Sequence, residues 1–253
     1  MLKIALSGCS GRMGRVISDI VSSRDGMEIA VGFDIRTEQY ADFPIYKDFA
    51  EYQGDCDVVI DFSNAALTER LLDYCEARRL PVVICTTGHS AEQLDRIRAA
   101  SASIPVFRSG NMSIGIYLMS ELLKKSASVL GDKYDVEIIE KHHNQKLDAP
   151  SGTAIMLADA VASALPYKAE YVYDRHERRE KRPAHEIGIS AVRGGNIVGE
   201  HEVIFAGLDE VIEFKHTAYS KAVFAKGAVS AAKFLKGKGP GYYDMSDVIE
   251  ANA

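Results

Sequence analysis

Strand-like and helix-like segments alternate along the first part of this chain. Apolar runs typical of strands cover residues 2–6, 27–33, 58–62, 81–85 and 104–107. Helical spacing or a helix cap marks residues 12–23, 67–78 and 90–100, with Ser90 as the expected cap of the last helix. Repeated strand–helix units imply a parallel sheet covered by helices on both faces. The first part of the chain is therefore predicted to be an α/β domain.

A glycine-rich turn follows the first strand and opens the first helix. It reads Gly8-Cys-Ser-Gly-Arg-Met-Gly14, which has G-x-x-G-x-x-G spacing. Glycines there allow a tight turn and let a pyrophosphate approach the helix N-terminus. Asp34 ends the second strand, 20 residues after Gly14, where an acid can bind the ribose hydroxyls of adenosine. The combination predicts a Rossmann-type dinucleotide-binding domain, in which Arg12 and Arg36 either hold phosphate charge or are surface arginines.

Two later turns belong to the same predicted site. Cys85-Thr86-Thr87-Gly88 follows the fourth strand, and Ser109-Gly110-Asn111-Met112 follows the fifth. Ligands of open parallel sheets bind at the carboxyl ends of the strands, where these turns lie. Each turn could be a plain strand-to-helix connection, but their shared position favours a cofactor site.

The pattern changes after residue 113. A long apolar helix is expected over residues 114–130, a strand over 134–141 and a helix over 154–165. Residues 171–216 are strand-rich with a turn at Gly194-Gly195, residues 222–235 are helical, and glycine and proline punctuate residues 237–241. This order predicts a second, α+β domain with a mixed sheet.

The second domain contains a stretch rich in proton-transfer groups. His142 and His143 precede Lys146 by four and three residues, a turn follows, and Ser151-Gly152-Thr153 begins a predicted helix. A helix N-terminus attracts anions, and adjacent proton donors suit reduction of a polar double bond on a carboxylated substrate. The alternative is a strand, a turn and a helix with solvent-facing polar residues, in which Thr153 merely caps the helix.

Composition excludes several classes of protein. The formal charge of −6 argues against non-specific nucleic-acid binding. The basic cluster at 174–182 is interleaved with acids, which favours a solvated face or loop. No signal peptide or membrane-spanning stretch is expected. The cysteines lack metal-ligand spacing and suggest reduced, mostly buried thiols of a cytosolic protein: Cys9, Cys56, Cys75 and Cys85.

These motifs together resemble the 4-hydroxy-tetrahydrodipicolinate reductase (dihydrodipicolinate reductase) family of diaminopimelate and lysine biosynthesis. The similarity covers nearly the whole chain, and the segment from His142 to Thr153 is its most specific part. The matching motifs are Gly8–Gly14, Asp61-Phe-Ser63, Thr86-Thr87-Gly88, Asn111-Met-Ser113, His142-His143-x-x-Lys146 and Asp148-Ala-Pro-Ser-Gly-Thr153.

The resemblance implies a role for each site residue. His142 would be the general acid/base, Lys146 a second proton donor and His143 a substrate-binding residue. Gly152 and Thr153 would hold a substrate carboxylate through backbone N–H and hydroxyl groups. No metal is expected. The cofactor-binding residues are expected to be Gly8, Cys9, Ser10, Gly11, Arg12, Met13, Asp34, Cys85, Thr86, Thr87, Ser109, Gly110, Asn111 and Met112.

The resemblance also implies an architecture and a reaction. Residues 1–113, completed by the returning segment 222–253, would bind the dinucleotide. Residues 114–221 would bind substrate and assemble a homotetramer. The expected reaction is the NADH- or NADPH-dependent reduction of a small cyclic imine dicarboxylate to tetrahydrodipicolinate. Many family members have Arg directly after the ribose-binding acid, whereas Ile35 separates Asp34 from Arg36 here. We therefore expect NADH to serve at least as well as NADPH.

Two other functions remain open from the sequence. The chain could be a different nicotinamide oxidoreductase of a small carboxylated substrate, such as an amino-acid or semialdehyde dehydrogenase. A semialdehyde dehydrogenase needs a nucleophilic cysteine with a partner histidine, and none of the four cysteines has that setting. A non-catalytic dinucleotide sensor would keep the glycine turn without needing His142, His143 or Lys146.

Overall fold

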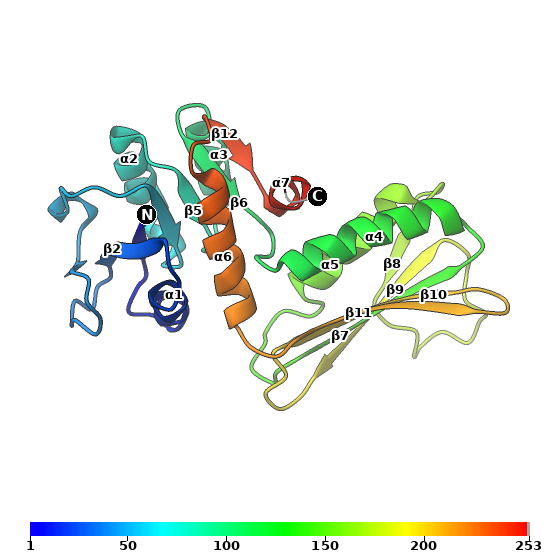
Figure 1. The fold of residues 1–253 in the computed structure, drawn as a ribbon. Coiled ribbons are helices and arrows are strands. Elements are labelled where there is room, and N and C mark those ends of the chain that lie inside the picture. The colour runs from blue at the N-terminus through cyan, green and yellow to red at the C-terminus, as the bar shows by residue number, and fades with distance from the viewer. Residues whose placement is uncertain (252–253) are drawn as a thin grey trace. The chain divides into compact units, whose positions relative to one another are not determined.

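The computed structural model describes residues 1–251 and divides into two compact units (Figure 1). The first unit contains residues 1–113 and the C-terminal segment from Ala222, and the second contains residues 114–221. The expected dinucleotide-binding domain runs to residue 253, so its last two positions lie outside the described residues.

The first unit is built on a seven-stranded sheet in which all neighbouring strands are parallel. The strand order is β12-β6-β5-β4-β1-β2-β3. Strands β2 and β3 are added on one side of β1, and β4 and the later strands on the other, so the strand order switches between β1 and β4. Ligands of such sheets bind at the carboxyl ends of the strands beside this switch. The strands are β1 Leu2–Ser7, β2 Met27–Phe33, β3 Ile45–Tyr46, β4 Val58–Asp61, β5 Val82–Ile84, β6 Pro105–Arg108 and β12 Gly241–Tyr243.

Helices cover both faces of this sheet (Figure 1). One face packs its alternate residues, including Ala5 and Val59, against Leu71, Leu72 and Ile97 of α2 and α3. On the other face α6 contacts α1 and strands β4, β5 and β6. The helices are α1 Arg12–Ser22, α2 Thr68–Arg78, α3 Ala91–Ala100, α6 Ala222–Leu235 and α7 Met245–Glu250, with short 3₁₀ turns at Phe49–Glu51 and Ala65–Leu67. This arrangement is the expected Rossmann-type plan.

The second unit is a five-stranded mixed sheet with two helices on one face. The order is β11-β10-β7-β9-β8, in which β7 pairs in parallel with β9 and antiparallel with β10. Ile138, Val203 and Phe205 pack with α4 and α5 in one core. The elements are α4 Ile114–Leu130, β7 Asp135–His142, α5 Gly152–Ala164, β8 Glu170–Val172, β9 Glu186–Arg193, β10 Gly199–Ala206 and β11 Val211–Ala218. The expected α+β fold of this domain is confirmed.

The basic cluster at 174–182 lies in a loop, as expected, but it is solvated only in part. Arg175 and Arg178 each bind the carboxylate of Glu186, which is buried at the start of β9. Arg182 reaches Glu137 of β7 through Nε at 3.0 Å. A buried carboxylate must be paired, so these arginines attach the loop to the sheet.

The sequence did not predict the short elements β3, β12 and α7. Strands β3 and β12 have two and three residues, and both edges of the parallel sheet are formed by them. Helix α7 begins at an Asp244 capping box. Helix α5 starts two residues before the expected position. Strands and helices this short carry too few residues to show a period.

The four cysteines partly match the expectation of mostly buried thiols. All four cysteines are free, with Cys9 and Cys75 buried and Cys56 and Cys85 partly exposed. Within residues 1–251, no helix combines the length and the apolar character needed to cross a membrane.

Candidate active site

The turn after β1 requires its glycines. Gly8 has φ +79°, and a Cβ there would lie 2.5 Å from the carbonyl oxygen of Phe62. A Cβ on Gly14 would lie 2.3 Å from the carbonyl oxygen of Gly8, so α1 packs directly on the turn. Gly11 is the N-cap of α1 and offers no capping side chain. The first N–H groups of this helix are therefore not occupied by a cap, as an anion site requires.

The structure brings Asp34 and Arg36 to this same turn. The Asp34 carboxylate accepts a hydrogen bond from the Ser10 backbone N–H at 3.0 Å. The Arg36 guanidinium donates to the Ser10 carbonyl at 3.0 Å, and the Ser10 hydroxyl donates to the Arg36 carbonyl at 2.8 Å. Acid and arginine thus lie side by side at the carboxyl end of β2.

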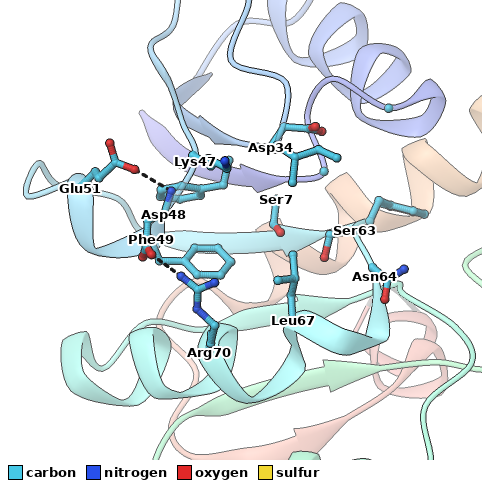
Figure 2. Close-up of a pocket in the computed structure, with 15 residues that line it drawn as sticks. Ser7, Asp34, Lys47, Asp48, Phe49, Glu51, Ser63, Asn64, Leu67 and Arg70 are labelled. Carbon is cyan, nitrogen blue, oxygen red and sulfur yellow. Dashed lines mark hydrogen bonds and ion pairs between the residues drawn. The ribbon is translucent and has the colours of Figure 1, made fainter.

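A cavity of about 570 Å³ opens beside these residues (Figure 2). In Figure 2, Asp34 and Lys47 lie on one side of it, with Leu67 and Arg70 on the other. Arg70 is ion-paired with Asp48 at the rim. A cavity of this volume with one acid at a strand end fits a nucleoside.

A second cavity, of about 600 Å³, follows the ends of β4 and β5. Arg12, Met13, Cys85, Thr86 and Thr87 line it together with residues 62–65. The turn after β5 therefore faces the glycine turn, as the sequence predicted.

Buried Asp61 holds the walls of this second cavity together. Its carboxylate accepts hydrogen bonds from the Thr86 hydroxyl at 2.6 Å and the Ser63 hydroxyl at 2.5 Å. The sequence indicates Asp61 only as part of a family motif. The structure shows that it ties the end of β4 to the end of β5.

The third turn is fixed by the C-terminal segment. A Cβ on Gly227 of α6 would lie 1.6 Å from the Met112 carbonyl oxygen, so the helix packs directly on the turn. The first residue of α7, Met245, donates its backbone N–H to the Ser109 hydroxyl at 3.3 Å. The glycine turn, Asp34 and the turn at 85–88 line the two cavities, whereas residues 109–112 are among the lining residues of neither.

In the second unit, His142 ends β7 and is 8% exposed. Its Nδ1 lies 2.6 Å from Oε2 of Glu140, whose side chain is fully buried. Arg193, at the end of β9, donates one N–H to each Glu140 oxygen at 2.7 Å. The Ser151 backbone N–H donates to Oε1 of Glu140 at 2.9 Å. His142 is therefore held by a buried, fully paired carboxylate.

Burial and charge act against each other in this group. Burial would raise the pKa of Glu140, but the hydrogen bonds from Arg193, His142 and Ser151 outweigh it and lower the pKa. Burial lowers the pKa of His142, which Glu140 opposes and Lys146 and Arg193 reinforce. The ring of His201 meets that of His142 edge to face at 5.1 Å between centroids.

Lys146 and His143 lie in the turn that follows β7. The Lys146 ammonium pairs with Asp148 at 2.8 Å, and its backbone N–H donates to the His143 carbonyl at 3.1 Å. The positive charge of Lys146 also lowers the pKa of His142. Nδ1 of His143 is buried and has no hydrogen-bond partner among residues 1–251.

Ser151, rather than Thr153, caps helix α5. The Ser151 hydroxyl oxygen accepts from the Ala154 N–H at 3.1 Å and lies 3.0 Å from Nε2 of His201. The alternative that Thr153 is the cap is therefore wrong. Gly152 is exposed, and no atom lies within 4 Å of the position its Cβ would take. An anion can approach the helix backbone closely at this position.

Sequence reasoning assigned no role to Glu140, Arg193 or His201. The signal for Glu140 is visible in β7, where Val136, Ile138, Glu140 and His142 share the buried face. A carboxylate beside an imidazole on an otherwise apolar face must be paired.

Known proteins match both units. The family model for the N-terminus of dihydrodipicolinate reductase matches residues 2–112, and that for its C-terminus matches residues 115–249. The chain is 47% identical over 251 residues to 4-hydroxy-tetrahydrodipicolinate reductase of Clostridium tetani, covering 99% of this chain and 98% of that protein. It is 49% identical over 250 residues to the enzyme of the same name from Caldanaerobacter subterraneus, covering 99% of each chain.

A solved structure shares the fold. A dipicolinate-bound dihydrodipicolinate reductase from Paenisporosarcina sp. TG-14 superposes with a TM-score of 0.77 at 23% identity, over 96% of this chain and 97% of that one. The full-length matches favour this family over the open alternatives of a different dehydrogenase class and a non-catalytic sensor. The chain belongs to the 4-hydroxy-tetrahydrodipicolinate reductase (dihydrodipicolinate reductase) family of oxidoreductases.

Proposed function

We propose that this chain reduces 4-hydroxy-tetrahydrodipicolinate to tetrahydrodipicolinate with NADH or NADPH, in diaminopimelate and lysine biosynthesis. The observation that carries the proposal is the grouping in the second unit. His142 is held by a buried carboxylate, Lys146 follows four residues later and lowers the pKa of His142, and α5 begins with exposed Gly152. The bound nicotinamide cofactor would supply hydride to C4 of the substrate ring.

The protein's part in this reaction is proton transfer and orientation. The dehydrated substrate is a conjugated imine, so hydride addition at C4 leaves an enamine that must gain a proton. His142 or Lys146 would stabilise the developing charge and donate that proton. A positioned acid of this kind accelerates a reaction by about 10²- to 10⁴-fold.

Substrate orientation would come from the start of α5. The backbone N–H of Gly152 and the hydroxyl of Thr153 would bind one substrate carboxylate, with His143 contributing a further contact. The helix dipole places partial positive charge at this end, which favours an anion by roughly 0.3–1 kcal/mol.

The cofactor site would extend along the three turns of the first unit. Asp34 would accept the adenosine ribose hydroxyls in the cavity of about 570 Å³. The glycine turn would hold the pyrophosphate, and the turns at 85–87 and 109–112 would line the nicotinamide half. Arg36 lies beside Asp34 and would offset repulsion of a 2′-phosphate, so both cofactors would be used, with NADH at least as good as NADPH.

We further propose that the chain works as a cytoplasmic homotetramer assembled through the second unit. One face of its sheet is covered by α4 and α5, while Ile139 and Ile204 point to the opposite face. Val192 and Val211 are 44% and 58% exposed on strands of the same sheet. Apolar residues on an uncovered sheet face favour burial in a symmetric partner. The four free cysteines suit a reducing compartment.

Titration calorimetry separates this proposal from its alternatives. The protein is titrated first with NADH and then with pyridine-2,6-dicarboxylate, a planar analogue of the substrate. Binding of the dicarboxylate to the cofactor-loaded protein is the expected result. Cofactor binding without any response to the dicarboxylate would instead favour a dinucleotide sensor.

A further inference from the structure

The Glu140 carboxylate is surrounded by groups that can only donate hydrogen bonds. Two N–H groups of Arg193 and the backbone N–H of Ser151 all point at its oxygens, at 2.7, 2.7 and 2.9 Å. A guanidinium and an amide cannot accept a proton, so Glu140 must stay ionised to satisfy them. The same hydrogen bonds lower its pKa.

An ionised Glu140 determines the tautomer of His142. Nδ1 of His142 lies 2.6 Å from Oε2, and a carboxylate without a proton can only accept there. Nδ1 therefore carries a proton in every charge state of the ring. The exchangeable proton of His142 is left on Nε2.

A glycine on the neighbouring strand keeps Nε2 accessible. Gly199 begins β10, and a Cβ at this position would lie 3.1 Å from Nε2 of His142. Any larger residue would crowd the nitrogen that carries the exchangeable proton. Glu140 of β7 thus sets the tautomer of His142, and Gly199 of β10 leaves its Nε2 accessible.

We propose that Glu140, anchored by Arg193 and the Ser151 N–H, is a positioning residue that fixes His142 with Nδ1 protonated and Nε2 presented to the substrate. This inference rests on the proposed role of His142 as the acid. Glu140 touches neither substrate nor cofactor in this account. It acts through the imidazole, as the orienting carboxylate does in other carboxylate–histidine pairs.

The charges around His142 give the expected direction of the pH effect. Glu140 on the same strand favours the charged imidazole, whereas Lys146 and Arg193 disfavour it. The neighbouring ring of His201 brings no negative charge. Removal of the Glu140 charge should therefore lower the pKa of His142. An acid with a lower pKa loses its proton at lower pH, so the alkaline limb of the pH profile of kcat should shift to lower pH.

The test compares two glutamates of the same strand in the full-length protein. Glu140→Gln keeps the size of the side chain but removes the charge. Glu137→Gln is the matched control, because Glu137 also pairs with two arginines, Arg175 and Arg182, without touching His142. Glu140→Gln should lower kcat at neutral pH by about tenfold or more, with KM changed less than about threefold and the alkaline limb displaced. Glu137→Gln should retain the wild-type pH profile.

Nitrogen-15 NMR of the imidazoles reads the tautomer without any turnover. The His142 signals are assigned by their loss in His142→Gln. Neutral His142 of the wild type should be protonated on Nδ1, and protonation on Nε2 would overturn the inference even if Glu140→Gln failed to fold. An unchanged kcat and pH profile in folded Glu140→Gln would overturn it as well. If the wild type itself has no reductase turnover, the proposed function fails while the tautomer remains measurable.

Discussion

Asp34 and Arg36 are two residues apart, yet both bind the backbone of Ser10. Period-2 alternation in a continuing strand would place them on the same side, but β2 ends at Phe33. The structure instead turns the chain back, so that the Arg36 N–H donates to the Asp34 carboxylate at 3.1 Å. The acid and the arginine therefore meet at one site, where they would have opposite effects on a 2′-phosphate.

The choice of cofactor follows from this pair. In Arg36→Ala, kcat/KM with NADPH should fall by about tenfold, because the guanidinium beside Asp34 that offsets its repulsion of the 2′-phosphate is lost. kcat/KM with NADH should change little and serves as the control within the same variant. A wild-type preference for NADPH above about tenfold, roughly 1.4 kcal/mol, would contradict the assignment of Asp34.

His201 should make the protein sensitive to acid. Burial, followed by the nearby His142, lowers the pKa of His201 from 6.5 to about 4. The folded state therefore disfavours the charged form of His201. The contribution of neutral His201 to the free energy of unfolding is fully present above pH 6.5 and is lost as the pH falls towards 4. Its loss between pH ~6.5 and ~5 is about 2 kcal/mol.

Urea unfolding of the wild type and His201→Gln at these two pH values measures this contribution. The glutamine can still form a hydrogen bond with the Ser151 hydroxyl but does not titrate. The variant should lose less stability than the wild type on acidification. Equal losses in the two proteins would assign the acid sensitivity to other groups.

At the scale of secondary structure, two residues at the start of helix α5 have different roles: Ser151 caps the helix, and Thr153 is the proposed ligand-binding residue. Thr153 lies two residues beyond Ser151 along the chain and is half-buried. Ser151→Ala should lower the free energy of unfolding by about 1 kcal/mol, as loss of an N-cap does. Thr153→Val should raise KM, with a smaller effect on kcat.

Steady-state kinetics and thermal unfolding of both variants test this division. Each variant is the control for the other, because they remove one hydroxyl each from the same helix start. A Thr153→Val enzyme with wild-type KM would remove Thr153 from the carboxylate site.

The elements differ in how far the sequence could predict them. The bounds of α4 and α6 agree with prediction, because both are long helices rich in apolar residues. The edge strands β3 and β12 and the last helix α7 were missed, because pairing with a neighbouring strand or packing against α6 defines them more than their own residues do.

The candidate site was predictable where one segment carries it. His142, Lys146 and the residues at 151–153 lie within a single stretch of sequence. The residues that hold His142 do not lie within that one stretch. Glu140, Arg193 and His201 meet only through the register of β7 with β9 and β10. Register between strands some 50 residues apart in sequence is not visible in the period of either strand.

At the scale of the whole molecule, the sheet of the second unit should form the interface between subunits. Multi-angle light scattering at micromolar concentration should give the mass of a tetramer of the 27.7 kDa chain. Ile204→Glu, on the open face of β10, should shift the mass towards smaller species, since it places charge in the interface. A wild-type monomer would contradict the proposed assembly.

The central claim is that the two units together perform one reduction. The most direct measurement couples the purified protein to the synthase that produces 4-hydroxy-tetrahydrodipicolinate and follows NADH oxidation. The wild type should turn over, and His142→Gln and Lys146→Ala should each lower kcat by on the order of 10²-fold while cofactor affinity by calorimetry stays the same. Absence of synthase-dependent NADH or NADPH oxidation by the folded wild-type protein, or near-wild-type turnover in both variants, would contradict the account.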